Sequence, residues 1–339
     1  MLVDMVMLGV SLGVILLASL AFTNGVELLG ARLKLHQGAT GSILAAVGTA
    51  LPETIIPVIA IVVYRADSNA MQVGIGAIAG APFMLATLAF FVTGVSVLVY
   101  AATGRRTLVM HADTRVIGRD LSFFFCLYGA AVLTTFAHDS VFFRPLKLLV
   151  AIVLLLSYIW YVRRTILAEG VQHGELEPLH MARLLRTGNH APLVALQVAG
   201  ALALMVWGAD LFVWYVGKLS LRLGMSPLIL SMIITPVATE LPEKLNSVIW
   251  TRQRKDTLAM GNITGAMVFQ SSFPVVFGLL FTPWDLRGAP LVSAAIALAG
   301  AGLVLAWIRL KRTLNPYVLL AGGPLYAVFV VYIYLHTQG

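Results

Sequence analysis

Long apolar segments alternate with short polar ones along most of the chain. A helix that crosses a bilayer needs about 20 apolar residues. Segments of this kind lie at approximately 3–33, 40–64, 71–100, 120–138, 145–166, 191–222, 227–250, 259–282, 288–308 and 315–336. The pattern predicts an all-α polytopic membrane protein with ten transmembrane helices. The first segment has no basic flank and no clear cleavage site, so we expect it to be a spanning helix and not a cleaved signal.

The composition agrees with this class. Hydrophobic residues make up 59% of the 339 residues and charged ones 11%, whereas about a quarter of a soluble domain is charged. The net charge of +8 requires no nucleic-acid partner, because basic residues collect in the cytoplasmic loops of membrane proteins. The single cysteine, Cys126, excludes an intrachain disulfide. We expect an integral plasma-membrane protein with no bound cofactor and no obligatory protein partner.

Basic residues are distributed unevenly between the two sides. Sixteen Lys and Arg residues lie in the loops after the odd-numbered segments, and six lie on the other side. The positive-inside rule therefore places both termini outside the cytoplasm. The longest linker lies at the midpoint, so we divide the chain into a first five-helix part (1–168), a cytoplasmic linker (169–190) and a second five-helix part (191–339).

The two halves contain a related stretch. Residues 21–53 and 211–243 align without a gap at an offset of 190, and they end in TALPE and TELPE. A helix with small residues follows each copy, GIGAIAGAPFML and GNITGAMVFQSS, and such residues let another helix approach closely. Five segments separate the copies, so the copies enter the membrane from opposite sides. Inverted repeats of this kind are typical of secondary transporters, which bind their substrate where the repeats meet.

The repeated motif brings hard oxygen ligands to the middle of a span. Proline has no N–H, and its ring clashes with the carbonyl four residues back, so Pro52 and Pro242 free the carbonyls of Gly48 and Ala238. Carbonyl, hydroxyl and carboxylate oxygens suit Ca²⁺, Mg²⁺, Mn²⁺ or Na⁺. The threonine hydroxyls could instead bond back to their own helices. The expected ligands from the two copies are Gly48, Thr49, Glu53, Ala238, Thr239 and Glu243.

Carboxylates at the bilayer centre are costly and are kept for ions, protons or a partner. We expect Glu53 and Glu243 to face each other across one ion. A salt bridge between helices is the alternative, with Lys244 as a candidate, although it points about 100° away from Glu243 on a helix. Glu240 lies on the same helix face as Glu243, where the first copy has Ala50, and it is either a ligand or a partner of Lys244.

Two further acids remain open at this point. Asp210 and Glu27 lie within predicted spans, and each either lines an access path or lies near the membrane interface.

The GTALPE and ATELPE stretches, each followed by a GxIxG helix, resemble the two α-repeats of the sodium/calcium exchanger family, part of the cation/Ca²⁺ antiporter superfamily. GADLFV at 208–213 is similar to the same family. The resemblance implies ten helices as two inverted five-helix repeats, and exchange of cytoplasmic Ca²⁺ for Na⁺ or H⁺ by alternating access. It places the central ion-binding glutamates at Glu53 and Glu243 and the threonine ligands at Thr49 and Thr239.

The chain departs from this family at several polar positions. Family members usually have a serine after each threonine, where this chain has Ala50 and Glu240. Their GSN-like runs are replaced here by GAP at 80–82 and GAM at 265–267. Gln270 corresponds to another polar family position, so we add it to the expected ion ligands.

These departures favour protons as the coupling ion. Na⁺ needs several neutral oxygens, which are largely missing, whereas three mutually repelling carboxylates favour a bound proton on at least one of them. We therefore expect a secondary active antiporter that exports a divalent cation, Ca²⁺ through the resemblance, in exchange for H⁺. Na⁺/Ca²⁺ exchange, and exchange of Mg²⁺, Mn²⁺ or a monovalent cation, are the alternatives.

Other functional classes fit less well. An intramembrane metalloenzyme would need histidine ligands in the spans, but all seven histidines lie in loops or near segment ends, so we expect no enzyme. The linker residues His173, Glu175, Glu177 and His180 would permit a regulatory metal site, although a solvated loop is the simpler interpretation. A cation channel would use the same carboxylates and would need no counter-ion.

Overall fold

The computed structural model describes residues 1–32, 52–169 and 178–337. These residues are nearly all helical; they contain no β-strand beyond an isolated bridge between Met110 and Leu314. Eight helical segments within them are long and apolar enough to cross a membrane, and two shorter apolar helices are Pro52–Val63 and Pro227–Glu240. The helical membrane-protein class is thus confirmed. The second expected span begins outside the described residues, so the count of ten stays a prediction.

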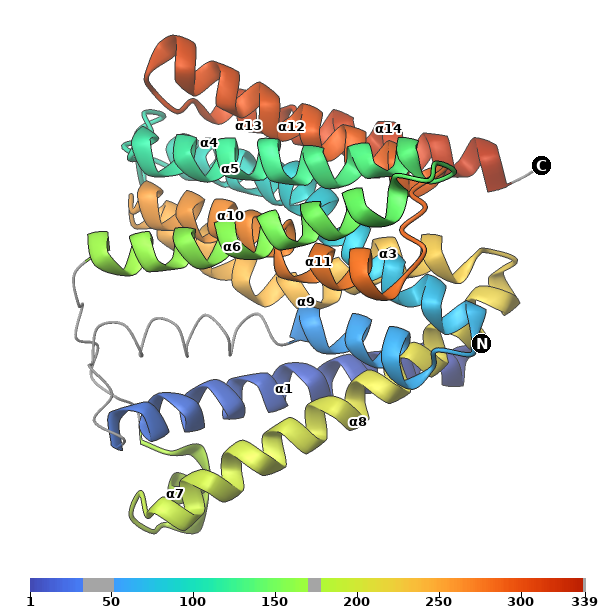
Figure 1. Ribbon diagram of the computed structural model, residues 1–339. Coiled ribbons are helices and arrows are strands. Elements are labelled where there is room, and N and C mark those ends of the chain that lie inside the picture. Colours follow the sequence, from blue (N-terminus) through green and yellow to red (C-terminus); the bar gives the residue numbers. More distant parts are fainter. Residues whose placement is uncertain (33–51, 170–177, 338–339) are drawn as a thin grey trace. The chain divides into compact units, whose positions relative to one another are not determined.

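Figure 1 labels most of the helices. Their bounds are α1 (Leu2–Arg32), η1 (Ile59–Val63), α3 (Ser68–Met84), η2 (Leu85–Ala89), α4 (Phe90–Ala102), α5 (Thr114–Leu133), η3 (Thr134–Ala137), α6 (Phe143–Glu169), α7 (His180–Leu185), α8 (Ala191–Leu223), α9 (Pro227–Arg252), α10 (Asp256–Gln270), α11 (Phe273–Phe281), α12 (Ala289–Lys311), α13 (Pro316–Leu320) and α14 (Gly322–Thr337).

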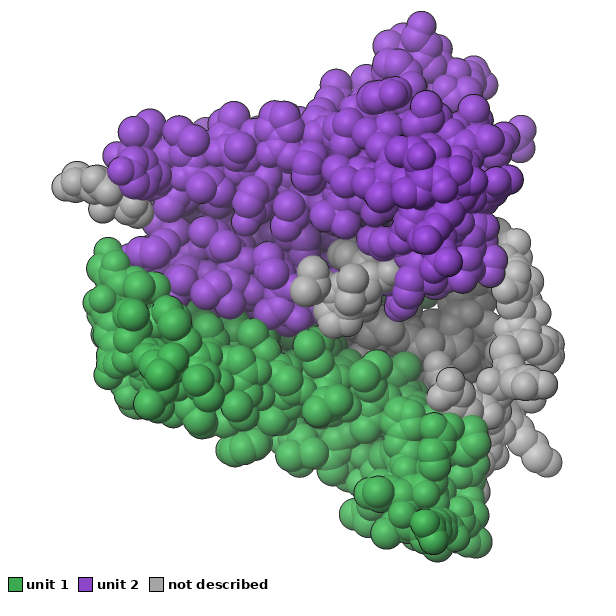
Figure 2. Space-filling model, turned by 180° about the vertical axis from the view of Figure 1, so that it is seen from behind, with its two compact units in different colours: residues 1–71, 156–224 green, residues 72–155, 225–339 purple. Residues whose placement is uncertain are grey.

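The chain forms two compact units, which Figure 2 colours separately. Unit 1 contains residues 1–71 and 156–224, and unit 2 contains residues 72–155 and 225–339. Each unit therefore combines segments from both halves of the sequence. The division expected at the midpoint linker concerns the two repeats along the sequence and not compact units in space. That division stays a prediction.

In unit 1, α1 and α8 pack side by side (Figure 1). Asp4 near the start of α1 forms ion pairs with Lys218 (3.3 Å) and Arg222 near the end of α8. Toward the other end of the pair, Gln197 Nε2 donates a hydrogen bond to Asn24 Oδ1 (3.0 Å). These contacts make the two helices antiparallel. The helices contain the first parts of the two stretches aligned at offset 190, residues 21–32 and 211–222, and these two parts run in opposite directions.

The midpoint linker contains a short helix that the sequence pattern did not predict. The α7 helix begins at His180, whose backbone N–H donates to Asn24 Oδ1 (3.0 Å), and the next backbone N–H, that of Met181, donates to Gln197 Oε1 (2.8 Å). Polar side chains of α1 and α8 thus hold the start of α7. His173, Glu175 and Glu177 lie outside the described residues.

In unit 2, small residues bring α3 and α9 into backbone contact. A Cβ atom added at Gly80 would overlap the carbonyl of Met232, and one added at Gly76 would overlap that of Leu228. Ser231 Oγ donates to the carbonyl of Val73 (2.7 Å) across the same interface. Close packing is thus confirmed for GIGAIAG.

The second small-residue helix differs. A Cβ added at Gly261 or Gly265 in α10 would have no atom within 4 Å in the part of the chain that the structure describes. The close packing expected at these two glycines therefore stays a prediction, and the described contacts of the helix are made by its other faces. Asn262 Nδ2, for example, donates to Ser247 Oγ of α9 (3.1 Å).

We expect Gly80→Ala to destabilise the protein by about 1–3 kcal/mol, because an added methyl group forces apart two backbones already in contact. Gly265→Ala is the matched control, since it adds the same methyl group to a helix without a close neighbour among the described residues. Thermal unfolding of the purified proteins in detergent measures the difference. Equal midpoints for the two variants would contradict the backbone contact.

A buried ion pair holds the turn between α9 and α10. Arg106 and Asp256 are almost completely buried, and Nη1 of Arg106 lies 2.7 Å from Oδ1 of Asp256. The same Nη1 donates to the carbonyl of Thr251 near the end of α9 (2.7 Å), and the N–H of His111 donates to Asp256 Oδ2 (2.8 Å). Because all these groups are satisfied, the ends of α9 and α10 stay in register.

Candidate functional site

Glu240 lies deep within α9. The helix starts at a cap in which Ser226 Oγ accepts from the N–H of Ile229 (3.3 Å), with Pro227 at the first turn, where its missing N–H has no consequence. Glu240 is fully buried, and Gln270 Nε2 donates to its Oε1 (3.3 Å). The structure therefore brings together two of the residues expected to bind ions, which lie thirty positions apart in the sequence.

The span that carries Gln270 is broken directly after this residue. Its two parts are α10, which ends at Gln270, and α11, which begins at Phe273. The hydroxyls of Ser271 (3.1 Å) and Ser272 (2.6 Å) both donate to the carbonyl of Val268. Pro274 is in the first turn of α11, where its missing N–H has no consequence. Gln270 is the last residue of α10, and the last carbonyls of a helix have no partner within it. The residue that binds Glu240 thus has a carbonyl at a helix end, besides the proline-freed carbonyl of Ala238.

The broken span was predicted as a single helix over 259–282. The available signal was the SSFP run at 271–274, in which two serines precede a proline. Serine side chains compete for backbone hydrogen bonds, and proline removes one, so this combination favours a break. Broken helices at membrane depth are tolerated where they line a cavity or pack within protein.

Thr239 is buried beside Glu240, and its hydroxyl donates to the carbonyl of Thr235 in the preceding turn (3.0 Å). This is the back-bonded alternative, and it leaves the lone pairs of the hydroxyl oxygen as acceptors. Ala238 is half-buried in the same helix.

A row of polar residues follows α9 at a spacing of four, and the sequence analysis missed it. Ser231 Oγ lies 2.9 Å from Thr235 Oγ1, and the hydroxyl of Thr251 donates to the carbonyl of Ser247 (2.8 Å). The members of the row are Ser231, Thr235, Thr239, Glu243, Ser247 and Thr251. Residues four apart form a ridge that winds slowly around a helix. The ridge accordingly meets α3 at Ser231 and α10 at Ser247.

Glu53 of unit 1 is buried, with 7% of its surface exposed. It follows Pro52, the first described residue of the helix Pro52–Val63. Gly48 and Thr49 lie outside the described residues. Glu243 and Lys244 belong to α9, but their side chains also lie outside what is described. The expected pairing of Glu53 with Glu243 therefore stays a prediction. Among the described residues, no three His, Cys, Asp or Glu side chains converge on a common point.

Asp210 has a structural partner. The hydroxyl of Tyr64, in the turn before α3, donates to Asp210 Oδ1 of α8 (2.6 Å). This contact holds the turn against α8 within unit 1. The side chain of Glu27 is not among those described.

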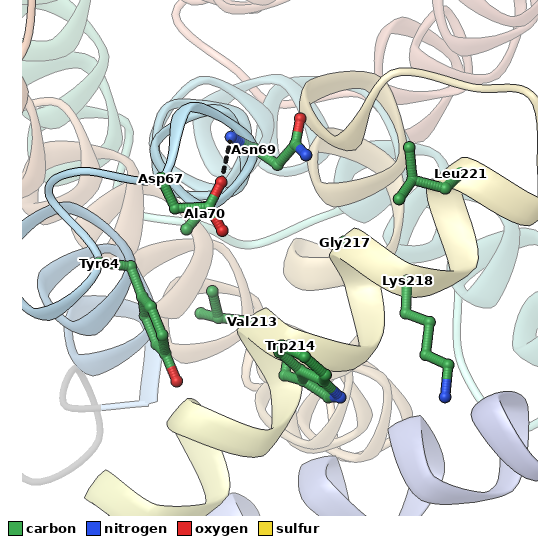
Figure 3. Close-up of a pocket in the computed structure, with 9 residues that line it drawn as sticks. All are labelled: Tyr64, Asp67, Asn69, Ala70, Val213, Trp214, Gly217, Lys218 and Leu221. Atoms are coloured by element: carbon green, nitrogen blue, oxygen red, sulfur yellow. Dashed lines mark hydrogen bonds between the residues drawn. The ribbon is translucent and has the colours of Figure 1, made fainter.

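The same turn and α8 enclose a cavity of about 260 Å³ in unit 1 (Figure 3). Its two charged side chains already have partners: Asp67 accepts from the N–H of Asn69 (2.8 Å), drawn in Figure 3, and Lys218 pairs with Asp4. The remaining lining is largely apolar, with Val213, Trp214 and Leu221. This cavity does not present an oxygen-rich ligand set for an ion.

A further buried carboxylate escaped the sequence analysis. Asp120 of α5 is 2% exposed; its Oδ2 accepts from the hydroxyl of Thr264 on α10 (2.9 Å), and its Oδ1 accepts from Arg119 (3.0 Å). The adjacent Arg119 neutralises it, so Asp120 connects α5 to α10 as part of an ion pair.

The family described as "Sodium/calcium exchanger protein" matches residues 3–167 and 193–338. The chain belongs to this family. It is therefore a membrane antiporter of the cation/Ca²⁺ class, and the resemblance drawn from the GTALPE and ATELPE stretches is confirmed. Among curated sequences, none matches the chain at a significant level.

Several solved structures share the fold of this exchanger-family chain. The structure of native YfkE has a TM-score of 0.70 at 13% identity, covering 98% of this chain and 92% of its own. The H⁺/Ca²⁺ exchanger CAX has a TM-score of 0.65 at 15% identity, covering 98% and 86%. The sodium-calcium exchanger NCX_Mj, soaked with Na⁺ and Sr²⁺, has a TM-score of 0.57 at 18% identity, covering 97% and 98%.

Proposed function

We propose that the protein exports a divalent cation, Ca²⁺ in the first instance, in exchange for protons. The observation that carries the proposal is Glu240, a fully buried acid on a membrane helix that is bound to Gln270 where α10 is broken. A buried ionisable group at membrane depth is kept for an ion or a proton. The same two helices supply further hard oxygens that we propose as ligands, namely the hydroxyl of Thr239, the proline-freed carbonyl of Ala238 and the carbonyl of Gln270 at the end of α10.

The Glu240–Gln270 contact suits a group that gains and loses a proton. An ionised Glu240 only accepts hydrogen bonds, and the amide N–H of Gln270 supplies one. A protonated Glu240 has an O–H to donate, and the amide oxygen of Gln270 accepts it once the amide turns over. The pair can therefore form a hydrogen bond in both protonation states.

We further propose that Glu53, Thr49, Gly48 and Glu243 complete the ion site, with Glu53 and Glu243 sharing the cation. This part of the proposal rests on the repeated TALPE and TELPE motifs and on family membership. We also propose that the protein has ten helices in two inverted repeats and works by alternating access between the two sides. It would lie in the plasma membrane with both termini outside the cytoplasm. The antiparallel packing of α1 and α8 supports the inverted arrangement.

Two structural relatives differ in the ion that their names give, since one is an H⁺/Ca²⁺ exchanger and another a sodium-calcium exchanger. The acid at position 240 and the loss of neutral polar side chains at several positions of the family pattern favour H⁺ over Na⁺ here. Na⁺/Ca²⁺ exchange, or exchange of Mg²⁺, Mn²⁺ or a monovalent cation, is the alternative outcome of the experiment below.

Liposomes containing the purified protein and a Ca²⁺-sensitive dye separate these possibilities. We expect an imposed pH gradient to drive Ca²⁺ flux without Na⁺ on either side. A Na⁺ gradient at constant pH is expected to drive none above protein-free liposomes. Flux that requires Na⁺ and ignores pH would overturn the coupling ion, and flux down the Ca²⁺ gradient with no counter-ion would indicate a channel.

A further inference from the structure

A basic cavity lies between α5 and α12 in unit 2, apart from the candidate ion site. Its volume is about 350 Å³, and it opens where α5 begins and α12 ends. Four arginines line it, together with Thr114 and Ile308. These arginines are Arg115, Arg119, Arg309 and Arg312. No carboxylate is among the residues that line it, so the cavity concentrates positive charge.

Two of the four guanidinium groups are held in place by neighbours. Arg119 Nε and Nη2 lie 3.1 and 3.0 Å from Oδ1 of Asp120, and Arg309 Nη2 donates to Ser122 Oγ (3.0 Å). Asp120 is 2% exposed, so it neutralises Arg119 from beneath and does not reach the opening.

The other two are exposed and carry no ion pair with a described residue. Arg115 lies in the first turn of α5, where Asp113 caps the helix by accepting from the N–H of Arg115 (2.8 Å). Arg312 lies just past α12 in a left-handed conformation with φ of 57°, which turns the chain back at the helix end. Even with Asp113 and Asp120 counted, the cavity keeps an excess of two positive charges. A site of this kind fits an anion with several acceptor oxygens, such as a phosphate. Guanidinium groups bind phosphate in a bidentate manner.

The position of the cavity suggests where such an anion comes from. α5 and α12 belong to segments apolar enough to cross a membrane, and the cavity lies at their ends, the depth of lipid headgroups. Basic pockets between membrane helices on the cytoplasmic side bind anionic headgroups, and both loops here lie on the side that the positive-inside rule assigns to the cytoplasm.

We propose that this cavity binds the phosphate headgroup of an anionic phospholipid. Arg115 and Arg312 contact the phosphate oxygens. Arg119 and Arg309, which Asp120 and Ser122 hold in place, supply further N–H donors. This lipid site lies apart from the candidate ion site and does not depend on which ions the protein transports.

Native mass spectrometry of the full chain in detergent tests the proposal, with phosphatidylglycerol as the probe and phosphatidylcholine as the neutral lipid. We expect saturable binding of phosphatidylglycerol to the natural sequence and none of phosphatidylcholine at the same concentration. Each arginine contributes a factor of about five, so Arg115→Gln/Arg312→Gln should weaken binding about 25-fold.

The matched control is Arg105→Gln/Arg252→Gln, which removes the same charge from exposed positions on the same side, outside the cavity lining. It should bind phosphatidylglycerol as the natural sequence does. An equal loss in both double variants, or no loss in either, would overturn the site. If inorganic phosphate displaces the lipid at equal concentration, the cavity is a free-anion site and not a lipid site. Should Arg115→Gln/Arg312→Gln aggregate, Arg115→Gln alone should still show about a fivefold loss.

Discussion

Replacing either Glu53 or Glu243 by glutamine is expected to abolish Ca²⁺ transport while the protein still folds. Glutamine keeps the size of the side chain and removes the charge that would bind a dication. An ionic contact at about 4 Å in a partly desolvated site is worth about 4 kcal/mol, a factor of about a thousand in affinity. We therefore expect at least a hundredfold weaker Ca²⁺ uptake in liposomes, measured with an internal dye at a fixed pH gradient.

Asp139→Asn is the control for this pair of variants. It makes the same carboxylate-to-amide change at an 80% exposed position, where Asp139 contacts Arg287 (2.7 Å). Exposed ion pairs contribute little, so uptake should match that of the natural sequence. Size-exclusion profiles and thermal midpoints show whether each variant is folded. Normal uptake by folded Glu53→Gln and Glu243→Gln proteins would refute the proposed site.

The second large effect is expected at Glu240. If protons compete with Ca²⁺ for its carboxylate, the apparent Ca²⁺ affinity falls as the pH falls, by up to about tenfold per pH unit for each competing proton. Glu240→Gln carries no titratable proton at this position. We expect the variant to retain Ca²⁺ binding by the two repeated glutamates. Its apparent Ca²⁺ affinity should depend less on pH, with about one competing proton fewer than in the natural sequence. Ca²⁺ titrations of the purified protein at several pH values measure this slope.

Asp120→Asn provides the matched control, because it neutralises another buried carboxylate in unit 2 that is already paired with Arg119 and bonded to Thr264. In this control, the change of apparent Ca²⁺ affinity per pH unit should equal that of the natural sequence. An unchanged slope in Glu240→Gln would assign the competing proton to another group, and a complete loss of Ca²⁺ binding would make Glu240 an essential ligand and not a separate proton carrier.

Helix positions were predictable from the sequence because the bilayer leaves few alternatives. Apolar segments of about 20 residues must satisfy their backbone groups internally, so they form helices. Predicted and observed bounds agree closely for α8, for example, predicted at 191–222 and found at Ala191–Leu223. The interruptions were less predictable. A break such as that after Gln270 depends on whether neighbouring side chains satisfy the freed backbone groups, and the hydrophobic pattern does not contain this information.

The candidate site was predictable in part. The duplicated motif predicted Glu53, Glu243 and the freed carbonyls as ligands, since duplication of polar residues in an apolar setting indicates function, and these ligands stay predictions. Glu240 was singled out as a ligand or a partner of Lys244, and Gln270 only through the family resemblance. Their contact joins two helices, so no local pattern predicts it. The polar row at a spacing of four on α9 is present in the sequence. Prolines and apolar residues lie between its members, so a search for apolar segments does not detect it.

The sequence by itself determined that this protein is a helical membrane protein, because hydropathy depends only on residue order. The resemblance of its repeated motif to the sodium/calcium exchanger family indicated an antiporter. Tertiary structure decided which polar groups meet. It bound Gln270 to Glu240, Thr264 to Asp120 and Tyr64 to Asp210, and it gathered arginines from α5 and from the end of α12 around one cavity. The physical reason is that membrane helices are individually specified by their apolar length, whereas the partner of each buried polar group is chosen by how the helices pack.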